Sequence, residues 1–99
     1  MKEILIPEEL KVGGHTYKVE WVKNLVRDEG NRGVVYWHKH TLVLDDNMEQ
    51  PNYTVSFLHE IVHCIDRHYL SDHISEDDTA TIAEGLFQVL SEMGVRFIK

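Results

Sequence analysis

The chain has little cysteine, no long apolar run and, over one long stretch, no basic residue. Cys64 is the only cysteine, which excludes an internal disulfide and favours a reducing compartment. No apolar stretch reaches the about 20 residues of a membrane-spanning helix, and the N-terminus has no apolar signal-peptide core. These absences predict a cytoplasmic protein that does not enter a membrane.

Basic residues are scarce in the second half of the chain. The sequence has 10 Lys and Arg against 17 Asp and Glu, a net charge of −7. Residues 1–40 are nearly neutral, whereas residues 41–99 carry most of the acidic excess, and no Lys or Arg lies between Arg67 and Arg96. Because an acidic surface repels phosphate backbones, we do not expect nucleic acid as a partner.

The length predicts a single domain over residues 1–99, since ordinary domains have about 100–150 residues. Apolar residues make up 42% of the chain, enough for one small core. At this size such a core is only marginally sufficient, so a bound metal or a partner would help to stabilise it.

Residue patterns predict a strand-rich half followed by a helical half. Residues 15–22 alternate, with Tyr17, Val19 and Trp21 on one side, as in a half-buried strand. Residues 33–37 and 41–44 are further short apolar runs, and residues 3–6 and 95–98 are strand-like. We expect an α+β domain with a small three-stranded twisted sheet and a final helical hairpin of two antiparallel helices.

Two amphipathic helices are predicted in the second half. The first begins near Pro51 and continues to Tyr69, with apolar residues at helical spacing. The second begins after Ser75, an N-cap residue type, and ends at Gly94. Its core-facing residues are expected to centre between four apolar positions: Ile82, Ala83, Leu86 and Leu90.

The first helix contains an H-E-x-x-H motif at His59, Glu60 and His63. Residues at i and i+4 share a helical face, so the two imidazoles can bind one metal ion. Glu60 is then beside the ion as the base that takes a proton from water, whose pKa zinc lowers toward about 7. Chance would give roughly 0.05 such motifs in a chain of this composition, and a mutually hydrogen-bonded His–Glu–His cluster is the alternative interpretation.

A catalytic zinc site needs a third protein ligand. The acidic start of the second helix can supply it, because the hairpin folds that end back toward the first helix. Glu76 and Asp78 both remain candidates on helix geometry. Glu76 has the longer reach and is the expected third ligand, whereas Asp78, the alternative, is placed to cap the helix with Ser75. Asp66 is interpreted as an acceptor behind the ligands or as a cap for the helix end.

The remaining candidates have structural interpretations. His38 and His40 are expected to be solvated, and Cys64 to be a small buried hydrophobe. Three residues just after the motif are expected at the surface, with stabilisation of an oxyanion by one of them as the alternative: His68, Tyr69 and His73. Three aromatic residues are expected in the core or in a groove wall: Trp21, Tyr36 and Trp37.

The segment Phe57–Asp66, followed by Glu76–Leu86, resembles small zinc metallopeptidase-like proteins of phages and prophages, which are similar to the ImmA/IrrE group. The resemblance implies a minimal zincin fold of gluzincin type, with an acidic ligand at the start of the next helix. Glu76 matches that position. It also implies a location in the cytoplasm of a bacterial host.

Together these features predict a zinc-dependent peptidase that acts on a protein or peptide, with Glu60 as the catalytic base. The strand at residues 41–44 is expected to offer its edge to an extended substrate. The alternative is a catalytically silent, zinc-stabilised protein that binds a host or phage protein. An open coordination position would indicate the enzyme, and a fourth protein ligand would indicate the binding protein.

Overall fold

A computed structural model describes residues 1–99 as an α+β fold with six strands, three α-helices and two short helical turns. In chain order the elements are β1 (Lys2–Leu5), β2 (Glu9–Val12), β3 (His15–Val22), α1 (Leu25–Glu29), β4 (Gly33–Tyr36), the 3₁₀ turn η1 (Trp37–Lys39), β5 (Thr41–Asp45), α2 (Asn52–Ile65), the π-helical turn η2 (Asp66–Leu70), α3 (Glu76–Glu92) and β6 (Val95–Ile98). None of these helices is both long and apolar enough to cross a membrane.

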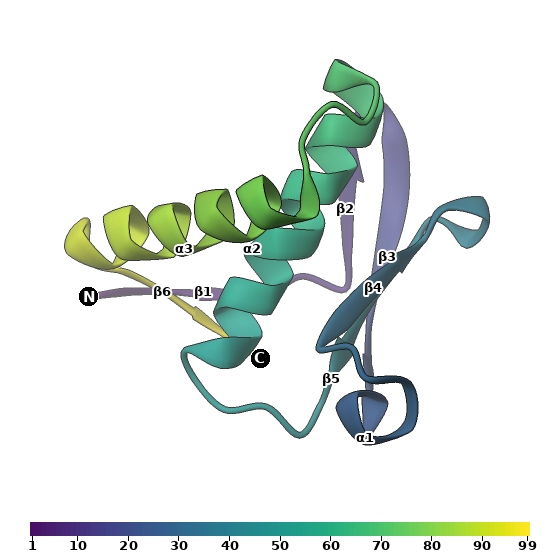
Figure 1. Ribbon diagram of the computed structural model, residues 1–99. Coiled ribbons are helices and arrows are strands. Elements are labelled where there is room, and N and C mark those ends of the chain that lie inside the picture. Colours follow the sequence, from purple (N-terminus) through teal and green to yellow (C-terminus); the bar gives the residue numbers. More distant parts are fainter.

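The main sheet has four strands in the order β2-β3-β5-β4. β2 and β3 form an antiparallel pair that turns at Gly13 and Gly14, which both have positive φ. β3 and β5 are parallel, and β4 pairs antiparallel with β5. β1 and β6 form a separate parallel pair that joins the two ends of the chain. In Figure 1, α2 lies between the main sheet and α3.

The expected α+β class is confirmed, but the sheet differs from the three strands expected. β2 was not predicted, because its four residues are too few to show alternation, and it is fixed by pairing with β3. β5 is fully buried between β3 and β4, so the prediction that it offers an edge to a substrate is wrong. β4 is the edge strand beside α2.

The core lies where α2 packs on the sheet and α3 packs on α2. Its central cluster contains residues from all three layers: Ile6, Val19, Leu42, Leu44, Tyr53, Phe57, Leu58 and Ala83. Tyr17 and Val19 point inward from β3 as the alternation predicts, and Trp21 packs against the same cluster. Burial of each Val, Leu, Ile or Phe side chain in this cluster contributes about 1.5–3 kcal/mol, relative to leaving it in water.

α3 packs through a face that is rotated from the one predicted: Ala83 and Leu90 contact the core as expected, but Ile82 and Leu86 do not. Thr79 and Ala83 are fully buried, whereas Ile82 and Leu86 are 40% and 41% exposed. At 100° per residue the centre of the buried face, between Thr79 and Ala83, is rotated by roughly 25° from its expected centre. This rotation turns Glu76 toward α2 and Asp78 away from it. Sequence periodicity could not show it, because α3 carries apolar residues on two of its sides.

Candidate metal centre

His59 and His63 project from the same side of α2, one helical turn apart. Both rings are partly covered, with side-chain exposures of 19% and 24%. Glu76 is the first residue of α3 and follows the N-cap Ser75, whose side chain accepts a hydrogen bond from the backbone N–H of Asp78. The cap fixes where α3 begins and thus where Glu76 lies.

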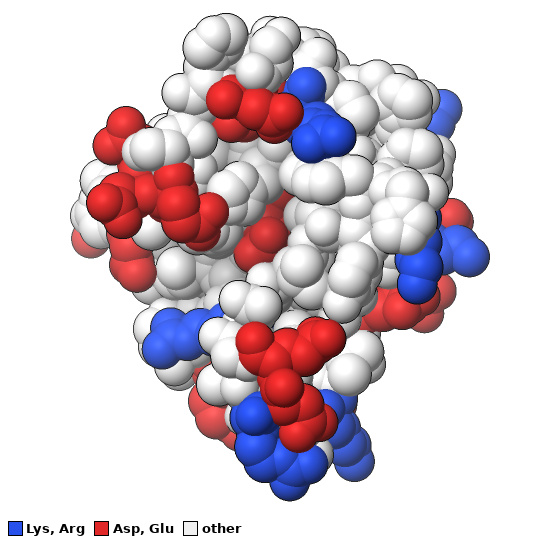
Figure 2. Space-filling view, turned by 45° about the vertical axis from the view of Figure 1, so that its right-hand side comes forward, with Lys and Arg blue, Asp and Glu red and all other residues white.

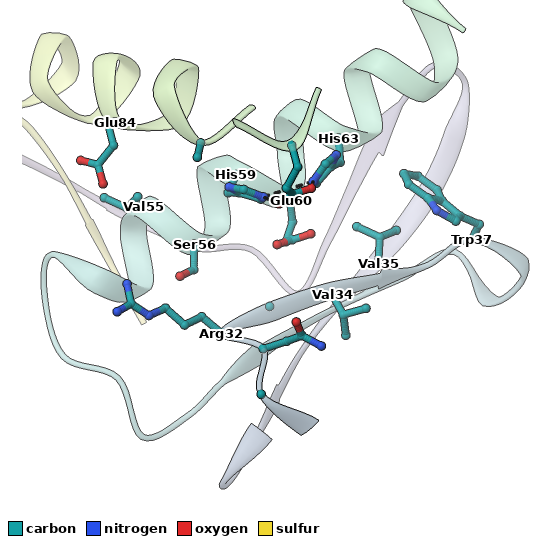
Figure 3. Close-up of a pocket in the computed structure, with 15 residues that line it drawn as sticks. Arg32, Val34, Val35, Trp37, Val55, Ser56, His59, Glu60, His63 and Glu84 are labelled. Atoms are coloured by element: carbon teal, nitrogen blue, oxygen red, sulfur yellow. Dashed lines mark hydrogen bonds and ion pairs between the residues drawn. The ribbon is translucent and has the colours of Figure 1, made fainter. Parts of the chain in front are cut away.

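The three side chains converge, and Figure 3 shows the labelled rings of His59 and His63 at the point where the dashed lines meet. His59 Nε2 lies 2.6 Å from Glu76 Oε1, and His63 Nε2 lies 2.9 Å from Glu76 Oε2. The two Nε2 atoms are 3.1 Å apart. We call His59, His63 and Glu76 the triad; its ligand atoms lie within 4.8 Å of one another, and no fourth His, Cys, Asp or Glu joins them.

This geometry suits a small divalent ion. Zinc binds imidazole nitrogen and carboxylate oxygen at about 2.0–2.2 Å in tetrahedral geometry, so neighbouring ligand atoms lie about 3.3 Å apart. The two Nε2 atoms, 3.1 Å apart, are close to that separation, and each of them lies near one oxygen of Glu76, at 2.6 and 2.9 Å. Two histidines and one glutamate are also a donor set of catalytic zinc sites that keep a fourth position open. The triad therefore fits a metal ion with an open position.

Glu60 lies beside the triad and is 6% exposed. It makes no hydrogen bond within the chain, and its carboxyl group borders the same pocket as the triad. Burial, together with the smaller effect of the neighbouring Glu76 carboxylate, raises its pKa to about 8. A carboxyl group with this pKa can both accept and release a proton near neutral pH.

A groove of about 580 Å³ runs between α2 and β4, with the triad and Glu60 on one wall. Figure 2 shows this hollow with acidic side chains inside it and on the rim to its left. Arg32 is the single basic residue of the lining, and Figure 3 shows it reaching across from the start of β4 toward Ser56. Trp37 closes the other end of the groove, with the Arg67 guanidinium over its ring.

Gly33 lets β4 pass close to Glu60. A Cβ atom at this position would lie 3.1 Å from Glu60 Cγ, from Glu60 Oε2 and from Leu44 Cδ2. This role of Gly33 was not among those predicted from the sequence. A glycine opening a strand pattern was the available signal, since it often marks a close approach by another group.

Three of the five histidines outside the motif form a second group away from the groove. His15 stacks on His40 and on His68, with ring centroids 5.0 and 4.7 Å apart. We call these three residues the histidine stack. Tyr17 lies beneath it and is 2.5 Å from His68 Nε2 through its hydroxyl. His40 is therefore half-buried rather than solvated, whereas His38 is exposed as expected.

Neither His68, Tyr69 nor His73 borders the groove, so none of them is placed to stabilise an oxyanion there. Tyr69 is 68% exposed, which agrees with its expected surface position. Asp66 is buried and accepts hydrogen bonds from the backbone N–H groups of His73 and Ile74. Asp66 thus holds the connection to α3, in agreement with the expected helix-end cap.

Cys64 is fully buried, and burial raises the pKa of its thiol to about 12. This agrees with the prediction of an unreactive small hydrophobe. Trp21 and Tyr36 are both partly buried, but only Trp37 of the three aromatic residues considered borders the groove.

Comparison with known proteins gives no match: no family model, no curated protein and no solved structure matches the chain. The geometry of the site itself must therefore carry the functional argument.

Proposed function

We propose that this protein is a zinc-dependent peptidase of minimal zincin type, with His59, His63 and Glu76 as the zinc ligands and Glu60 as the catalytic base. The observation that carries the proposal is the convergence of two imidazoles and one carboxylate beside a buried glutamate, with one side open to a groove. Three ligands with an open fourth position favour catalysis over a purely structural metal site.

Zinc would supply Lewis acidity here: it acidifies water and polarises a peptide carbonyl. Glu60 would accept the proton of the attacking water and then pass it to the leaving amine. A dication at the triad would also counteract the effect of burial and of Glu76 on Glu60, and so favour its carboxylate form.

The edge of β4 supports a peptide as the substrate. β4 has one strand neighbour, β5, so its other edge is free to pair with an extended chain. Gly33, Val34 and Val35 of this strand line the groove opposite the triad. A peptide paired with β4 would therefore pass directly by Glu60.

The proposal is tested by incubating zinc-loaded protein with a mixed peptide library and identifying the products by mass spectrometry. We expect cleavage by the wild type and not by Glu60→Gln. If the wild type binds zinc at the triad but cleaves no peptide or protein, the zinc-stabilised binding protein is the better description.

A further inference from the structure

α3 has a second apolar face that no part of the chain covers. Four side chains form it, and they are 40%, 41%, 52% and 71% exposed: Ile82, Leu86, Val89 and Met93. Their spacing of four, three and four residues places them in one line along the helix. Isolated exposed apolar residues are ordinary, but a continuous line of them marks an interaction surface.

Gly85 lies beside this line, in the middle of α3. A glycine there costs about 1 kcal/mol of helix stability relative to alanine. A Cβ atom at Gly85 would meet nothing within 4 Å, so the packing of this chain does not require a glycine. The missing side chain instead leaves room for the backbone of another segment to approach α3 next to Leu86.

The charges on α3 indicate what that segment carries. The first turn holds Glu76, Asp77 and Asp78, and the last turn holds no basic residue. Glu92 lies in the last turn, where the helix dipole disfavours a negative charge. α3 has no Lys or Arg at all, so a second copy packed on this face would bring like charges together.

We propose that the face formed by Ile82, Leu86, Val89 and Met93 binds a basic amphipathic helix of another protein. The apolar side of that helix would cover the line of exposed residues and approach closely at Gly85. Its Lys and Arg side chains would pair with Asp78 at one end and Glu92 at the other. This proposal does not depend on the metal centre, which lies on the other side of α3.

The test uses a fluorescent synthetic peptide of Leu and Lys, with Leu at helical spacing, and measures binding to the full chain by anisotropy. Two control peptides are a Leu and Glu version with the same spacing and a scrambled Leu and Lys version. We expect the basic helical peptide to bind more tightly than both controls, and to bind less tightly as salt screens the charges.

Two variants locate the surface. Leu86→Ser should weaken binding by at least about tenfold, as loss of a central apolar contact does. Val26→Ser is the matched control, because Val26 is 44% exposed on α1, away from α3. Gly85→Ala should raise the melting temperature and yet weaken binding, a combination that a general loss of structure cannot produce.

Equal binding of all three peptides would overturn the proposal, as would equal effects of Leu86→Ser and Val26→Ser. Tighter binding by Gly85→Ala would overturn the close approach at that residue. A wild-type dimer in light scattering that Leu86→Ser makes monomeric would show that a second copy occupies the face instead.

Discussion

Two groups of histidines lie at different parts of the molecule, and they differ in how their rings meet. In the triad the two rings are inclined at 69° and both Nε2 atoms point toward Glu76. In the histidine stack the rings are nearly parallel, at 25° and 22°, so that their faces are in contact. Only the triad brings ligand atoms together.

The difference shows that a cluster of histidines is not sufficient for a candidate metal site: three histidines form the stack, but only the triad, with two, brings ligand atoms together. Ligand atoms converge when two imidazoles are held at i and i+4 of one helix and a carboxylate completes the set. In the histidine stack each ring comes from a different part of the chain. These rings pack face to face through their flat, partly apolar surfaces. The stack also has no carboxylate among its ring contacts; its polar partner is the hydroxyl of Tyr17.

The largest expected effect is the loss of peptide hydrolysis in Glu60→Gln. This substitution keeps the size of the side chain but removes its ability to accept a proton. Peptide hydrolysis should fall at least about 10²-fold, while zinc binding persists. Glu84→Gln is the matched control, since Glu84 is an exposed residue of the same groove. Equal loss of hydrolysis in both variants would rule out the catalytic role proposed for Glu60.

Substitution of the triad residue Glu76 should weaken zinc binding much more than substitution of Asp78, its neighbour on α3. Glu76→Ala should weaken zinc binding by more than about 100-fold, because even residues behind the ligands contribute 10–100-fold. Asp78→Ala should change it little, since Asp78 contributes its backbone N–H to the cap. A competition titration with a chromophoric chelator measures both, and the reverse ranking would overturn the assignment of Glu76.

Zinc should stabilise the folded chain through the triad alone. A hundredfold excess of zinc over its dissociation constant adds about 2.7 kcal/mol to the free energy of unfolding. The rise in melting temperature should vanish in His63→Ala and persist in His40→Ala, and elemental analysis should find one zinc per chain. Zinc-dependent stabilisation that His40→Ala abolishes would mean that the stack, not the triad, binds the ion.

The stack should contribute a smaller, metal-independent stability. Tyr17→Phe removes the hydroxyl that contacts His68 and should lower the free energy of unfolding by about 1 kcal/mol in chemical denaturation. Tyr36→Phe should have less effect, because the Tyr36 hydroxyl has no hydrogen-bond partner in the chain. Equal values for the two variants would show that the contact with His68 contributes nothing.

The smallest expected effect is a pH dependence from His68. Its pKa is lowered by burial, by the neighbouring rings of His15 and His40 and by Arg67, while Asp72 acts in the opposite direction. The unfolded chain therefore binds a proton here more readily than the folded chain, so this contribution to stability is lost as pH falls below about 6.5.

Melting temperatures measured with a chelator across this range should fall less steeply in His68→Asn than in the wild type. The chelator removes the separate pH dependence of metal binding. Identical slopes would show that the folded state does not alter the protonation of His68.

Much of the candidate site could be predicted from local sequence. His59, Glu60 and His63 lie within one helical turn, so their arrangement depends on α2 forming and on nothing distant. Asp66 and Cys64 were also predictable, because each has a role set by its position on that helix. The strand alternation at Tyr17 and Val19 likewise fixed which side of β3 faces the core.

The remaining parts depend on how separate elements pack. The choice of Glu76 over Asp78 followed from a rotation of α3 that its two apolar faces left open. The position of β4 at the edge, and of Gly33 above Glu60, followed from a strand order that residue patterns do not contain. The stack joins residues up to 53 positions apart, whose proximity no short pattern encodes.

The sequence by itself determined the pair of imidazoles and the adjacent carboxyl group, because a helix of known pitch sets their spacing locally. Tertiary structure brought the expected Glu76, rather than Asp78, to the two histidines, and it alone decided which strand borders the groove and which apolar face of α3 stays uncovered. The physical reason is that helix geometry acts over a few residues, whereas packing chooses among several faces of comparable apolar character.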